Sequence, residues 1–349
     1  MSKDKIPVGI LGATGSVGQK FIQLLINHPE FEIVELAASQ RSAGNKYGEA
    51  VNWMMPVELP QSIAQIVVKN AAEINLNCAL VFSGLDASVA GEIEENYANS
   101  GYTVVSNSKN HRFDAFVPLL IPEVNPQHLD LLQYQTFAKG KIVTNPNCST
   151  IGMTMALKPL LDNFGLKQVN VVTMQAISGA GFPGLSGMSI VENVIPFIGG
   201  EEAKMESEPL KILGDVTPEG IKAADITVNA QCNRVQVIDG HMESVQVSLE
   251  NKASEKDIIE VWKNFKSEPQ ELELFYAPKN PIHYFDQQDY PQPRLHRDLE
   301  KGMAVSIGGL RGDKIFDYKF TVLSHNTVRG AAGGAILCAE LMTKKGLIS

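Results

Sequence analysis

The run NPNCST, from Asn145 to Thr150, places a cysteine directly after an apolar segment and a proline. The residues that follow have helical periodicity, with Asn147 at the N-cap position and Cys148 in the first turn. A helix N-terminus stabilises negative charge, so it favours the thiolate, the nucleophilic form of cysteine. The alternative is a structural thiol, because free cysteines are among the most buried residue types. Cys148 is therefore a candidate nucleophile whose assignment depends on the rest of the chain.

Two other side chains could take part in the reactions of such a cysteine. His241 follows a glycine in IDGHMESV, and an imidazole ordinarily titrates in the range that suits acid–base catalysis. Arg234 lies earlier on what reads as the same strand-like run, and its guanidinium suits a substrate carboxylate. The alternatives are a surface or core histidine and a structural ion pair.

Glycines recur at three-residue intervals in GATGSVG, where Gly12, Gly15 and Gly18 follow the apolar run IPVGIL. That run reads as a strand, and the segment after the glycines, up to Pro29, has the periodicity of an amphipathic helix. Between a strand and a helix, glycines let the main chain approach a pyrophosphate, whose charge the helix N-terminus then meets. In this context the motif favours dinucleotide binding over a purely structural turn.

The end of the second strand, FEIVELAA, selects between the two nicotinamide dinucleotides. An NAD site usually has an Asp or Glu there for the ribose hydroxyls. This chain has SQRSAG instead, so Ser39, Arg41 and Ser42 are available to a 2′-phosphate, and we expect NADP. The alternative is that Arg41 is a solvated surface charge, because Glu35 lies close by within the strand.

The elements that must position these residues divide the 349-residue chain into two domains. In the N-terminal part, apolar runs alternate with helical segments, as in a doubly wound parallel sheet. From Gln168 on, longer strand-like runs with fewer helices indicate a mixed sheet. We expect an α/β fold in which a Rossmann-type domain, 1–146, is completed by a C-terminal helix, 327–349, beside an α+β catalytic and dimerisation domain, 147–326.

The composition limits the classes of partner. A net charge of −9 and a pI near 5.4 argue against nucleic acid, and no apolar run is long enough to suggest a membrane span. The four cysteines are far apart and form no CxxC pair, which favours reduced thiols over a disulfide framework or a zinc site. We therefore expect a cytoplasmic protein without a metal.

Taken together, the motifs resemble those of the aspartate-semialdehyde dehydrogenases, most closely their archaeal and fungal branch. The resemblance covers nearly the whole chain and depends on GATGSVG, RSAG, SNSKNHR, NPNCST, QAISGAG, EEAK, CNRVQVIDGH and HNTVRGAAGG, in that order. It implies that Cys148 is the nucleophile that carries the acyl group and that His241 is its acid–base partner. It also implies that Gln175 helps to orient the acyl intermediate.

The resemblance further implies residues that bind the substrate and the cofactor. Glu201 is expected to bind a substrate amine, while Lys204 and Arg112 bind phosphate; without the resemblance, EEAKMESE would be interpreted as a solvated helix face. Asn147 and Arg234 complete the expected substrate contacts. The residues implied for the cofactor are Gly12, Thr14, Gly15, Ser16, Val17, Ser39, Arg41, Ser42, Ser83, Gly84, Ser178, Gly179 and Asn326.

The reaction that this resemblance implies is the NADPH-dependent reduction of 4-phospho-L-aspartate to L-aspartate 4-semialdehyde through a cysteine thioester. Such an enzyme would serve lysine, threonine and methionine biosynthesis and would form a homodimer or homotetramer through the sheet of its second domain. Two alternatives stay open at this point. One is a related acyl reductase, such as a malonyl-CoA or N-acetylglutamyl-phosphate reductase, and the other is a non-catalytic NADP-sensing protein.

Overall fold

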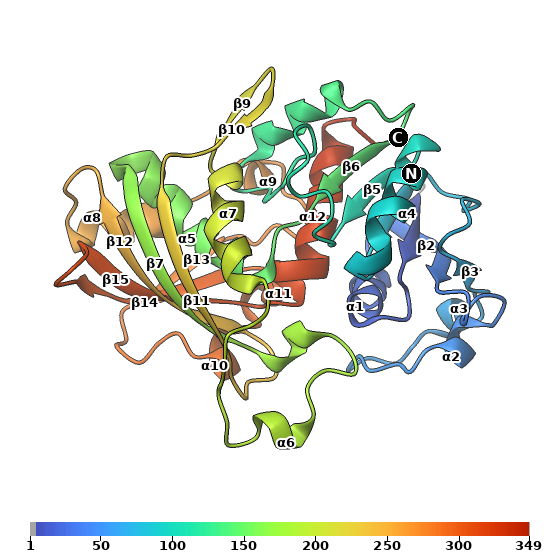
Figure 1. Cartoon of the computed structure of the whole chain (residues 1–349), viewed down its shortest axis with the longest axis horizontal. Helices are drawn as coiled ribbons and strands as arrows, with labels where there is room; N and C mark the ends of the chain where they lie inside the picture. Colours follow the sequence, from blue (N-terminus) through green and yellow to red (C-terminus); the bar gives the residue numbers. More distant parts are fainter. Residues whose placement is uncertain (1–4, 349) are drawn as a thin grey trace. The chain divides into compact units, whose positions relative to one another are not determined.

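The computed structural model describes residues 5–348, which form two compact units (Figure 1). The first unit contains the chain up to Leu120, together with His128–Asn145 and the residues from Ala332 on. The second unit contains Ile121–Gln127 and Pro146–Ala331. The chain thus passes from the first unit to the second immediately before Cys148.

A six-stranded sheet of order β3-β2-β1-β4-β5-β6 forms the centre of the first unit. All of its neighbouring strands are parallel, and β4, β5 and most of β1 are buried, as expected for a sheet covered on both faces. The strand order is that of a dinucleotide-binding sheet, which confirms the predicted Rossmann-type architecture. The strands are β1 (Ile6–Leu11), β2 (Phe31–Ala38), β3 (Lys69–Asn70), β4 (Leu80–Ser83), β5 (Thr103–Ser106) and β6 (Lys141–Thr144).

The helices of the first unit bury apolar stripes against this sheet. In α1 (Ser16–Leu25) the buried residues include Phe21 and Ile22 and, one helical turn later, Leu25. The N-cap of α4 (Ala87–Asn99) is Asp86, whose carboxylate accepts the Ser88 amide at 2.9 Å. The remaining elements are α2 (Tyr47–Ala50), α3 (Gln61–Ala64) and the 3-10 helix η1 (Pro126–Tyr134). The chain passes from the second unit back to the first within η1, between Gln127 and His128.

The C-terminal segment is not the single helix that we predicted over 327–349. It consists of a π-helical turn, η3 (Val328–Ala332), and then α12 (Gly333–Lys344), with a break at Ala331. Two contacts accompany the break: the Gly330 amide donates to the carbonyl of His325, and Arg329 forms a buried bidentate pair with Glu123 at 2.7 and 2.6 Å. These contacts hold the turn out of helical geometry, so the regular helix begins only at Gly333.

The second unit contains a mixed seven-stranded sheet of order β13-β14-β15-β12-β7-β11-β8, as the sequence predicted. The pairs β7/β11 and β13/β14 are parallel, and the other neighbouring pairs are antiparallel. The strands are β7 (Leu166–Gln175), β8 (Ile195–Pro196), β11 (Thr227–Arg234), β12 (His241–Leu249), β13 (Ile282–Phe285), β14 (Val305–Gly312) and β15 (Tyr318–Ser324).

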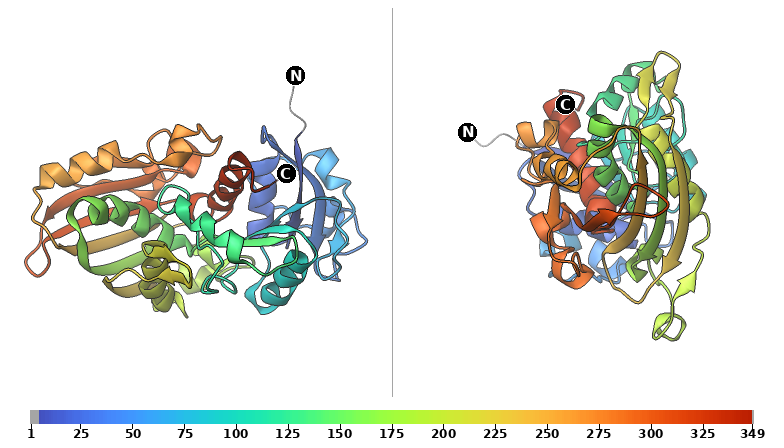
Figure 2. Two further views of the ribbon diagram at one scale, coloured as in Figure 1. Left: turned by 90° about the horizontal axis from the view of Figure 1, so that it is seen from above. Right: turned by 90° about the vertical axis from the view of Figure 1, so that its left-hand side faces the viewer.

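One face of this sheet is covered by α5 (Cys148–Phe164) and α8 (Glu255–Asn264), which also contact each other (Figure 2). Alternate residues of β12, from His241 to Leu249, are buried on that side, and those between them are half-buried. Trp262 of α8 is fully buried and donates its indole N–H to the carbonyl of Ala156 in α5 at 2.9 Å. The sheet therefore provides a rigid base for the start of α5.

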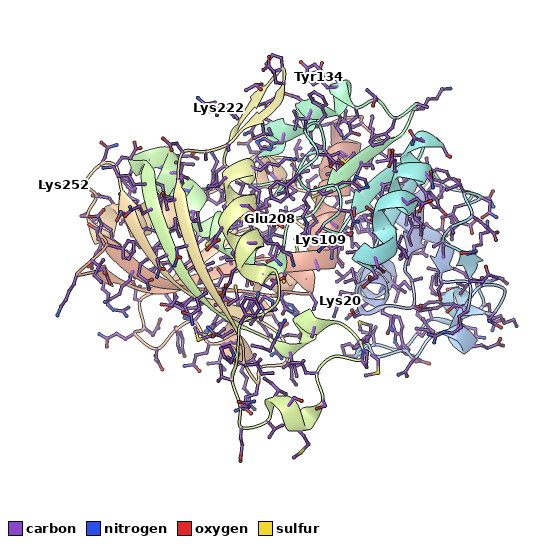
Figure 3. All side chains as sticks on the ribbon, viewed as in Figure 1. Lys20, Lys109, Tyr134, Glu208, Lys222 and Lys252 are labelled. Carbon is purple, nitrogen blue, oxygen red and sulfur yellow. The ribbon has the colours of Figure 1, made fainter. Side chains whose placement is uncertain are left out.

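Smaller elements of the second unit surround these layers. Helix α7 (Glu201–Ile212) packs beside β11 and α5. The hairpin of β9 (Asp215–Thr217) and β10 (Gly220–Lys222) ends with Lys222, which pairs with Asp215 at the base of the hairpin (Figure 3). The others are η2 (Ile177–Ala180), α6 (Gly187–Ile190), α9 (Glu268–Glu271), α10 (Pro293–His296) and α11 (Leu299–Gly302).

No helix within residues 5–348 is long and apolar enough to cross a membrane. None of the four cysteines forms a disulfide. Over the same residues, no group of three or more His, Cys, Asp or Glu side chains is arranged to hold a metal ion.

Candidate active site

The start of α5 has the geometry that the sequence predicted. Asn147 is the N-cap, and its side-chain oxygen accepts the amides of Ser149 at 3.0 Å and Thr150 at 3.4 Å. Cys148 is the first residue of the helix and is partly exposed. Gly330 packs directly on it, because a Cβ added to Gly330 would lie 2.8 Å from the Cys148 Cβ. Cys148 is thus held in the capped first turn of α5, with the main chain of Gly330 packed against it.

Three strand ends bring the other candidates together. Gln175 ends β7, Arg234 ends the parallel neighbour β11 in register with it, and His241 begins the antiparallel neighbour β12. Our prediction that Arg234 and His241 share one strand was therefore wrong, since residues 235–240 turn the chain from one side of β7 to the other. The turn brings both side chains to the same end of the sheet.

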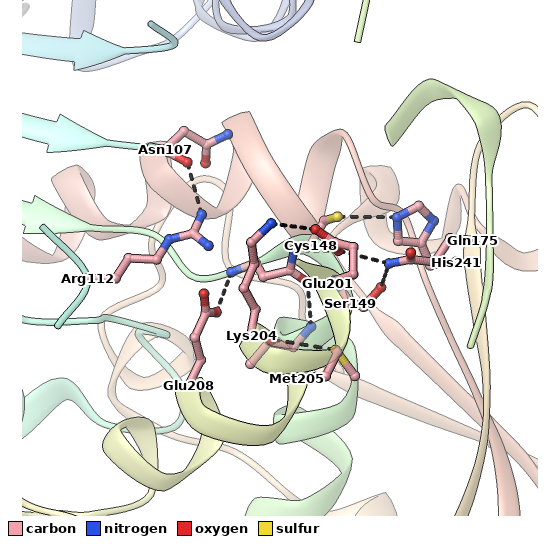
Figure 4. A network of polar contacts seen from close by, with 12 residues as sticks. Asn107, Arg112, Cys148, Ser149, Gln175, Glu201, Lys204, Met205, Glu208 and His241 are labelled. Atoms are coloured by element: carbon pink, nitrogen blue, oxygen red, sulfur yellow. Dashed lines mark hydrogen bonds and ion pairs between the residues drawn. The ribbon is translucent and has the colours of Figure 1, made fainter. Parts of the chain in front are cut away.

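Cys148 and His241 are in direct contact (Figure 4). The Sγ atom lies 3.2 Å from Nε2, and Nδ1 accepts the main-chain amide of Ala176 at 3.0 Å. The ring has no exposed surface, and this burial, with a smaller effect of the Arg234 charge, lowers the pKa of His241 to about 3. Burial therefore works against protonation of this imidazole.

Gln175 and Asn147 converge on one carboxylate. The Gln175 amide nitrogen donates to the Ser149 hydroxyl and to Glu201 Oε2, the latter at 3.2 Å, while the Asn147 side chain donates to the same oxygen at 2.7 Å. Lys204 pairs with the other oxygen, Oε1, at 2.5 Å. Burial alone would raise the pKa of Glu201, but Lys204 and these hydrogen bonds outweigh it and lower the pKa, so the carboxylate is ionised.

Arg234 is bound to main chain at the edge of the same cluster. Its Nη1 donates to the carbonyl of Ala176 at 2.7 Å, and only 7% of the residue is exposed. Burial lowers the pKa of Arg234 from its usual range. Gly179 lets the main chain pass close to this group, because a Cβ there would lie 2.8 Å from the Arg234 Nη1 and 3.2 Å from the His241 Cε1.

Three of the residues expected to bind the cofactor belong to the second unit. The Asn326 amide nitrogen donates to the Ser178 hydroxyl at 2.8 Å, and its oxygen accepts the amide of Gly240 at 2.9 Å. Gly240 directly precedes His241, and Gly179 follows Ser178. The structure therefore brings Ser178, Gly179 and Asn326 together beside the residues at the strand ends.

The glycine turn lies in the first unit, between β1 and α1. Gly12 has φ of +74°, and a Cβ there would lie 2.6 Å from the carbonyl oxygen of Gly84. A Cβ on Gly18 would lie 2.2 Å from the Gly12 oxygen, and Gly15 is the N-cap of α1. Only glycine fits these close approaches, and the free amides at the start of α1 suit a pyrophosphate. The expected contacts of Thr14, Ser16, Val17 and Gly84 all belong to this turn or pack on it.

The loop after β2 carries the residues expected to select NADP. Ser39 and Arg41 are exposed, and Ser42 is buried with its amide bonded to the Ser39 carbonyl at 2.9 Å. Glu35 is occupied elsewhere, because its carboxylate accepts Lys69 at 2.9 Å and both nitrogens of Asn77. The one acidic residue that argued against NADP therefore has a structural role.

A buried carboxylate lies beneath the ends of β4 and β5. Glu94 Oε1 accepts the hydroxyls of Ser83 at 2.5 Å and Ser106 at 2.7 Å. Burial raises the pKa of Glu94 despite these bonds. Arg112, also in the first unit, is buried and donates to the Asn107 carbonyl at 3.0 Å (Figure 4). Glu94, which the sequence analysis did not select, thus orients the Ser83 hydroxyl.

Sequence reasoning missed several residues that the structure places around Cys148. Ala176 contributes its main-chain amide and carbonyl, which the residue type does not indicate. Ser149 directly follows Cys148, and the sequence analysis considered only the cysteine. Glu208 on α7 (Figure 3) is fully buried and accepts the Asn147 amide at 2.7 Å. Its position two helical turns after Glu201, on the same face, is a signal that could have identified it.

Comparisons with known proteins agree with this arrangement. Residues 7–132 match the family described as "Semialdehyde dehydrogenase, NAD binding domain", and residues 157–329 match "Semialdehyde dehydrogenase, dimerisation domain". The aspartate-semialdehyde dehydrogenase of Schizosaccharomyces pombe is 51% identical over 352 residues, covering 98% of this chain and 99% of that one. Its counterpart from Methanothermobacter thermautotrophicus is 47% identical, covering 97% and 99%.

The solved structures give the same result. The crystal structure of aspartate-semialdehyde dehydrogenase with NADP from Candida albicans matches with a TM-score of 0.91 at 44% identity, covering 99% of this chain and 100% of that one. The chain therefore belongs to the semialdehyde dehydrogenase family. The predicted resemblance to fungal and archaeal members is confirmed by these relatives.

Proposed function

We propose that this chain is an NADP-dependent aspartate-semialdehyde dehydrogenase that reversibly reduces 4-phospho-L-aspartate to L-aspartate 4-semialdehyde through a thioester on Cys148. The observation that carries the proposal is the contact of Cys148 Sγ with His241 Nε2, 3.2 Å long, at the N-terminus of α5. The relatives are named aspartate-semialdehyde dehydrogenase, which supports this choice of substrate. Through this product the enzyme would supply lysine, threonine and methionine biosynthesis in the cytoplasm.

The chemistry follows from the position of the sulfur. The Cys148 thiolate attacks the acyl carbon, so a C–S bond forms, the bond from that carbon to the phosphate oxygen breaks, and phosphate leaves. A nicotinamide cofactor, when bound, would supply the hydride that reduces the thioester carbon. As the carbonyl then re-forms, the bond between the acyl carbon and the Cys148 sulfur breaks, which releases the aldehyde and leaves Cys148 as the thiolate. Amides in the first turn of α5 are suited to hold the developing oxyanion.

The charges near Cys148 suit an amino acid. Arg234 offers a guanidinium to the substrate carboxylate, and Glu201 offers an ionised carboxylate to the amine. Lys204, which pairs with Glu201 at 2.5 Å, is the cation on α7 that we propose binds phosphate, and Arg112 of the first unit is the second phosphate-binding residue of the proposal. Asn147 contributes its side-chain amide, and Gln175 orients the acyl group while it donates to Ser149. A carboxylate for the amine, a guanidinium for the carboxylate and cations for the phosphate together favour an amino-acid acyl phosphate as the substrate.

The residues present also fit an NADP cofactor. The glycine turn leads into the N-terminus of α1, whose first main-chain amides suit the pyrophosphate, and Ser39, Arg41 and Ser42 suit the 2′-phosphate. Ser83 and Gly84 follow at the end of β4. The Candida albicans relative was solved with NADP, which supports this choice.

A homo-oligomer is part of the proposal. The face of the seven-stranded sheet opposite α5 carries half-exposed polar side chains, including Asn170 and Gln246, which bond each other at 2.7 Å. The family description of this part of the chain as a dimerisation domain supports a contact between copies through this domain. Sedimentation analysis would distinguish a monomer, a dimer and a tetramer.

The test is an assay of NADPH formation by the purified protein from NADP and aspartate semialdehyde. We expect the reaction to require phosphate or arsenate, because the thioester needs an oxyanion nucleophile to release the acyl group. A reaction that ignores phosphate and requires coenzyme A would instead indicate a related acyl-CoA reductase. Replacement of aspartate semialdehyde by N-acetylglutamate semialdehyde tests the other acyl-phosphate substrate.

The non-catalytic alternative makes a different prediction for the thiol. An enzyme of this mechanism should lose activity when iodoacetamide alkylates one cysteine, and the substrate should protect it. A sensor of NADP would have no unusually reactive thiol. Mass spectrometry that locates the alkyl group on Cys148 would support the enzyme.

A further inference from the structure

The main chain at Gly330 lies directly against the nucleophile candidate. A Cβ added to Gly330 would lie 2.8 Å from the Cβ of Cys148, 2.9 Å from its Cα and 3.0 Å from its carbonyl oxygen. No side chain fits between them, so the main chain of one residue packs on the main chain of the other. Ala331, the next residue, has φ of −149° and ψ of −105°, so a regular helix does not hold this segment in place. Its position must come from other contacts.

Arg329, directly before Gly330, makes such contacts in two directions. Its Nη1 and Nη2 atoms donate to the two carboxylate oxygens of Glu123 at 2.7 and 2.6 Å, and Nη2 also lies 3.4 Å from the sulfur of Met155 on α5. Two parallel bonds fix the plane of a guanidinium as well as its position. The residue beside Gly330 is therefore held between Glu123 and the helix that begins with Cys148.

Glu123 belongs to a hydrogen-bonded turn that is closed without Arg329. The amides of Val124 and Asn125 donate to the carbonyl of Ile121 at 2.8 and 3.1 Å. The Ile121 amide in turn donates to the side-chain oxygen of Asn125 at 2.8 Å, and Asn125 has no exposed surface. The carboxylate that receives Arg329 is thus presented by a turn with its own internal bonds.

The burial of the pair distinguishes an indirect role from a direct one. Arg329 is 1% exposed, so its guanidinium has no surface to offer to a substrate or cofactor, and any effect on the reaction must pass through the main chain. Stability alone is a weak reason for such a pair, because the cost of desolvating two charges largely offsets their attraction. A bidentate pair does, however, provide a fixed direction.

We propose that Arg329 and Glu123 are positioning residues for the nucleophile, because their pair holds Gly330 against Cys148. This packing limits the movement of the first turn of α5 and so keeps the sulfur 3.2 Å from Nε2 of His241. A misplacement of about 1 Å can lower the rate of a reaction between two groups by about 100-fold. The inference rests on the proposed function for the reaction, whereas the position of the sulfur can be tested without it.

Removal of the whole pair tests this role without leaving a buried charge unpaired. In Arg329→Met/Glu123→Leu, two apolar side chains replace the ions, a change that often leaves stability unaltered. We expect kcat with aspartate semialdehyde to fall by about tenfold, and KM and NADP affinity to change by less than about twofold. The thermal midpoint should stay within about 5 °C of the original chain. Turnover at the original rate in the folded variant would overturn the proposal.

The reactivity of the thiol gives a readout that needs neither substrate nor cofactor. The rate at which iodoacetamide alkylates Cys148 in the ligand-free protein is measured at about pH 7 and about pH 10, with the site identified by mass spectrometry. The ratio of the two rates cancels changes in access of the reagent.

A sulfur aligned with the helix N-terminus reacts faster at the lower pH, so the ratio of the rate at pH 7 to the rate at pH 10 should fall by about threefold or more in the double variant. A merely structural role would not move this ratio. An unchanged ratio in the folded variant would show that the sulfur does not depend on the pair, and the proposal would be wrong.

Arg329→Lys keeps the charge of the pair and so tests the proposal even if the double variant does not fold. An ammonium cannot form two parallel bonds to Glu123, so we expect kcat to fall by about threefold and the alkylation ratio to fall with it. Full activity with an unchanged ratio would contradict the proposal.

The matched control is Lys158→Gln/Asp162→Asn. It removes a partly exposed ion pair, 2.6 Å long, that lies nearer the other end of α5. Both kcat and the alkylation ratio should stay as in the original chain. An equal loss in this control would mean that any ion pair of the helix has the same effect, and the special role of Arg329 and Glu123 would be refuted.

The failure of the inference and the failure of the proposed function look different. If the original protein does not reduce NADP with aspartate semialdehyde but the alkylation ratio falls in the double variant, the function is wrong and the positioning role stands. If the phosphate-dependent reaction is present and the folded double variant turns over normally, the function stands and the inference is wrong.

Discussion

Where the turn between β1 and α1 enters the helix, the groups suited to a ligand are main-chain amides at the start of α1, all from one contiguous stretch of chain. Around Cys148, they are side chains from α5, α7 and the ends of β7, β11 and β12. The first kind of site tolerates loss of a side chain but not the addition of one. The second kind depends on each side chain being present, and its main chain serves to position them. The difference predicts opposite responses of the two regions to substitution.

The largest effect is expected from removal of the nucleophile. Cys148→Ala should lower kcat by about 10³-fold or more, because no other group in the cluster can form the acyl bond, and Cys148→Ser should leave a trace at most. Steady-state NADPH formation and the binding of NADP are measured on the same protein. Full turnover of Cys148→Ala would contradict the proposed mechanism. Unchanged NADP binding is expected because the glycine turn is not altered.

Added methyl groups sharpen the comparison between the two regions. A Cβ in Gly18→Ala would lie 2.2 Å from the Gly12 oxygen, so NADP affinity should fall by about tenfold or more and unfolding should become easier by about 2 kcal/mol. A Cβ in Gly330→Ala would lie 2.8 Å from the Cys148 Cβ, so kcat should fall by about tenfold with little change in NADP affinity.

Gly187→Ala is the control for both variants, because nothing lies within 4 Å of a Cβ at that position. Its stability should stay within about 0.5 kcal/mol of the original chain. The measurements are cofactor titration, kcat and thermal unfolding. If Gly330→Ala weakened NADP binding as much as it lowered kcat, the two sites would not be separable in this way.

A conservative change at the strand ends should have an intermediate effect. Arg234→Lys keeps the charge but loses the planar fork that can bind the Ala176 carbonyl and a carboxylate together. We expect KM for aspartate semialdehyde to rise by about tenfold, with a smaller fall in kcat. Initial-rate kinetics at several substrate concentrations would check this split. A fall in kcat alone would show that Arg234 only supports the Ala176 peptide.

The smallest effect is expected at the exposed rim of the cofactor region. Arg41→Ala should raise KM for NADP by about three- to tenfold and leave KM for NAD unchanged, because the side chain is exposed and would contact only the 2′-phosphate. Lys46→Ala, nearby and exposed, is a suitable control for loss of a positive charge. Equal effects of Arg41→Ala on both cofactors would mean that another group selects NADP.

The sequence predicted the first unit better than the second. Strand, glycine turn and helix follow one another within thirty residues, and their spacing reflects local geometry, so β1, α1 and β2 were found where expected. The N-cap Asn147 and the first-turn position of Cys148 were also predicted correctly, because a helix start is a local feature. In the second unit, Arg234 and His241 were placed on one strand, because nothing local marked residues 235–240 as a turn that crosses β7.

The amino-acid sequence by itself determined the cysteine at a helix start, the glycine turn and the alternation of elements, because each depends on residues that are near one another in the chain. Only the tertiary structure decided which side chains surround the sulfur and how burial shifts the pKa of the imidazole among them. The contact of Ala176 with His241 joins residues 65 positions apart through an amide that every residue except proline has. The burial that lowers the pKa of His241 is likewise a property of the packed sheet and helices, to which no single stretch of sequence corresponds.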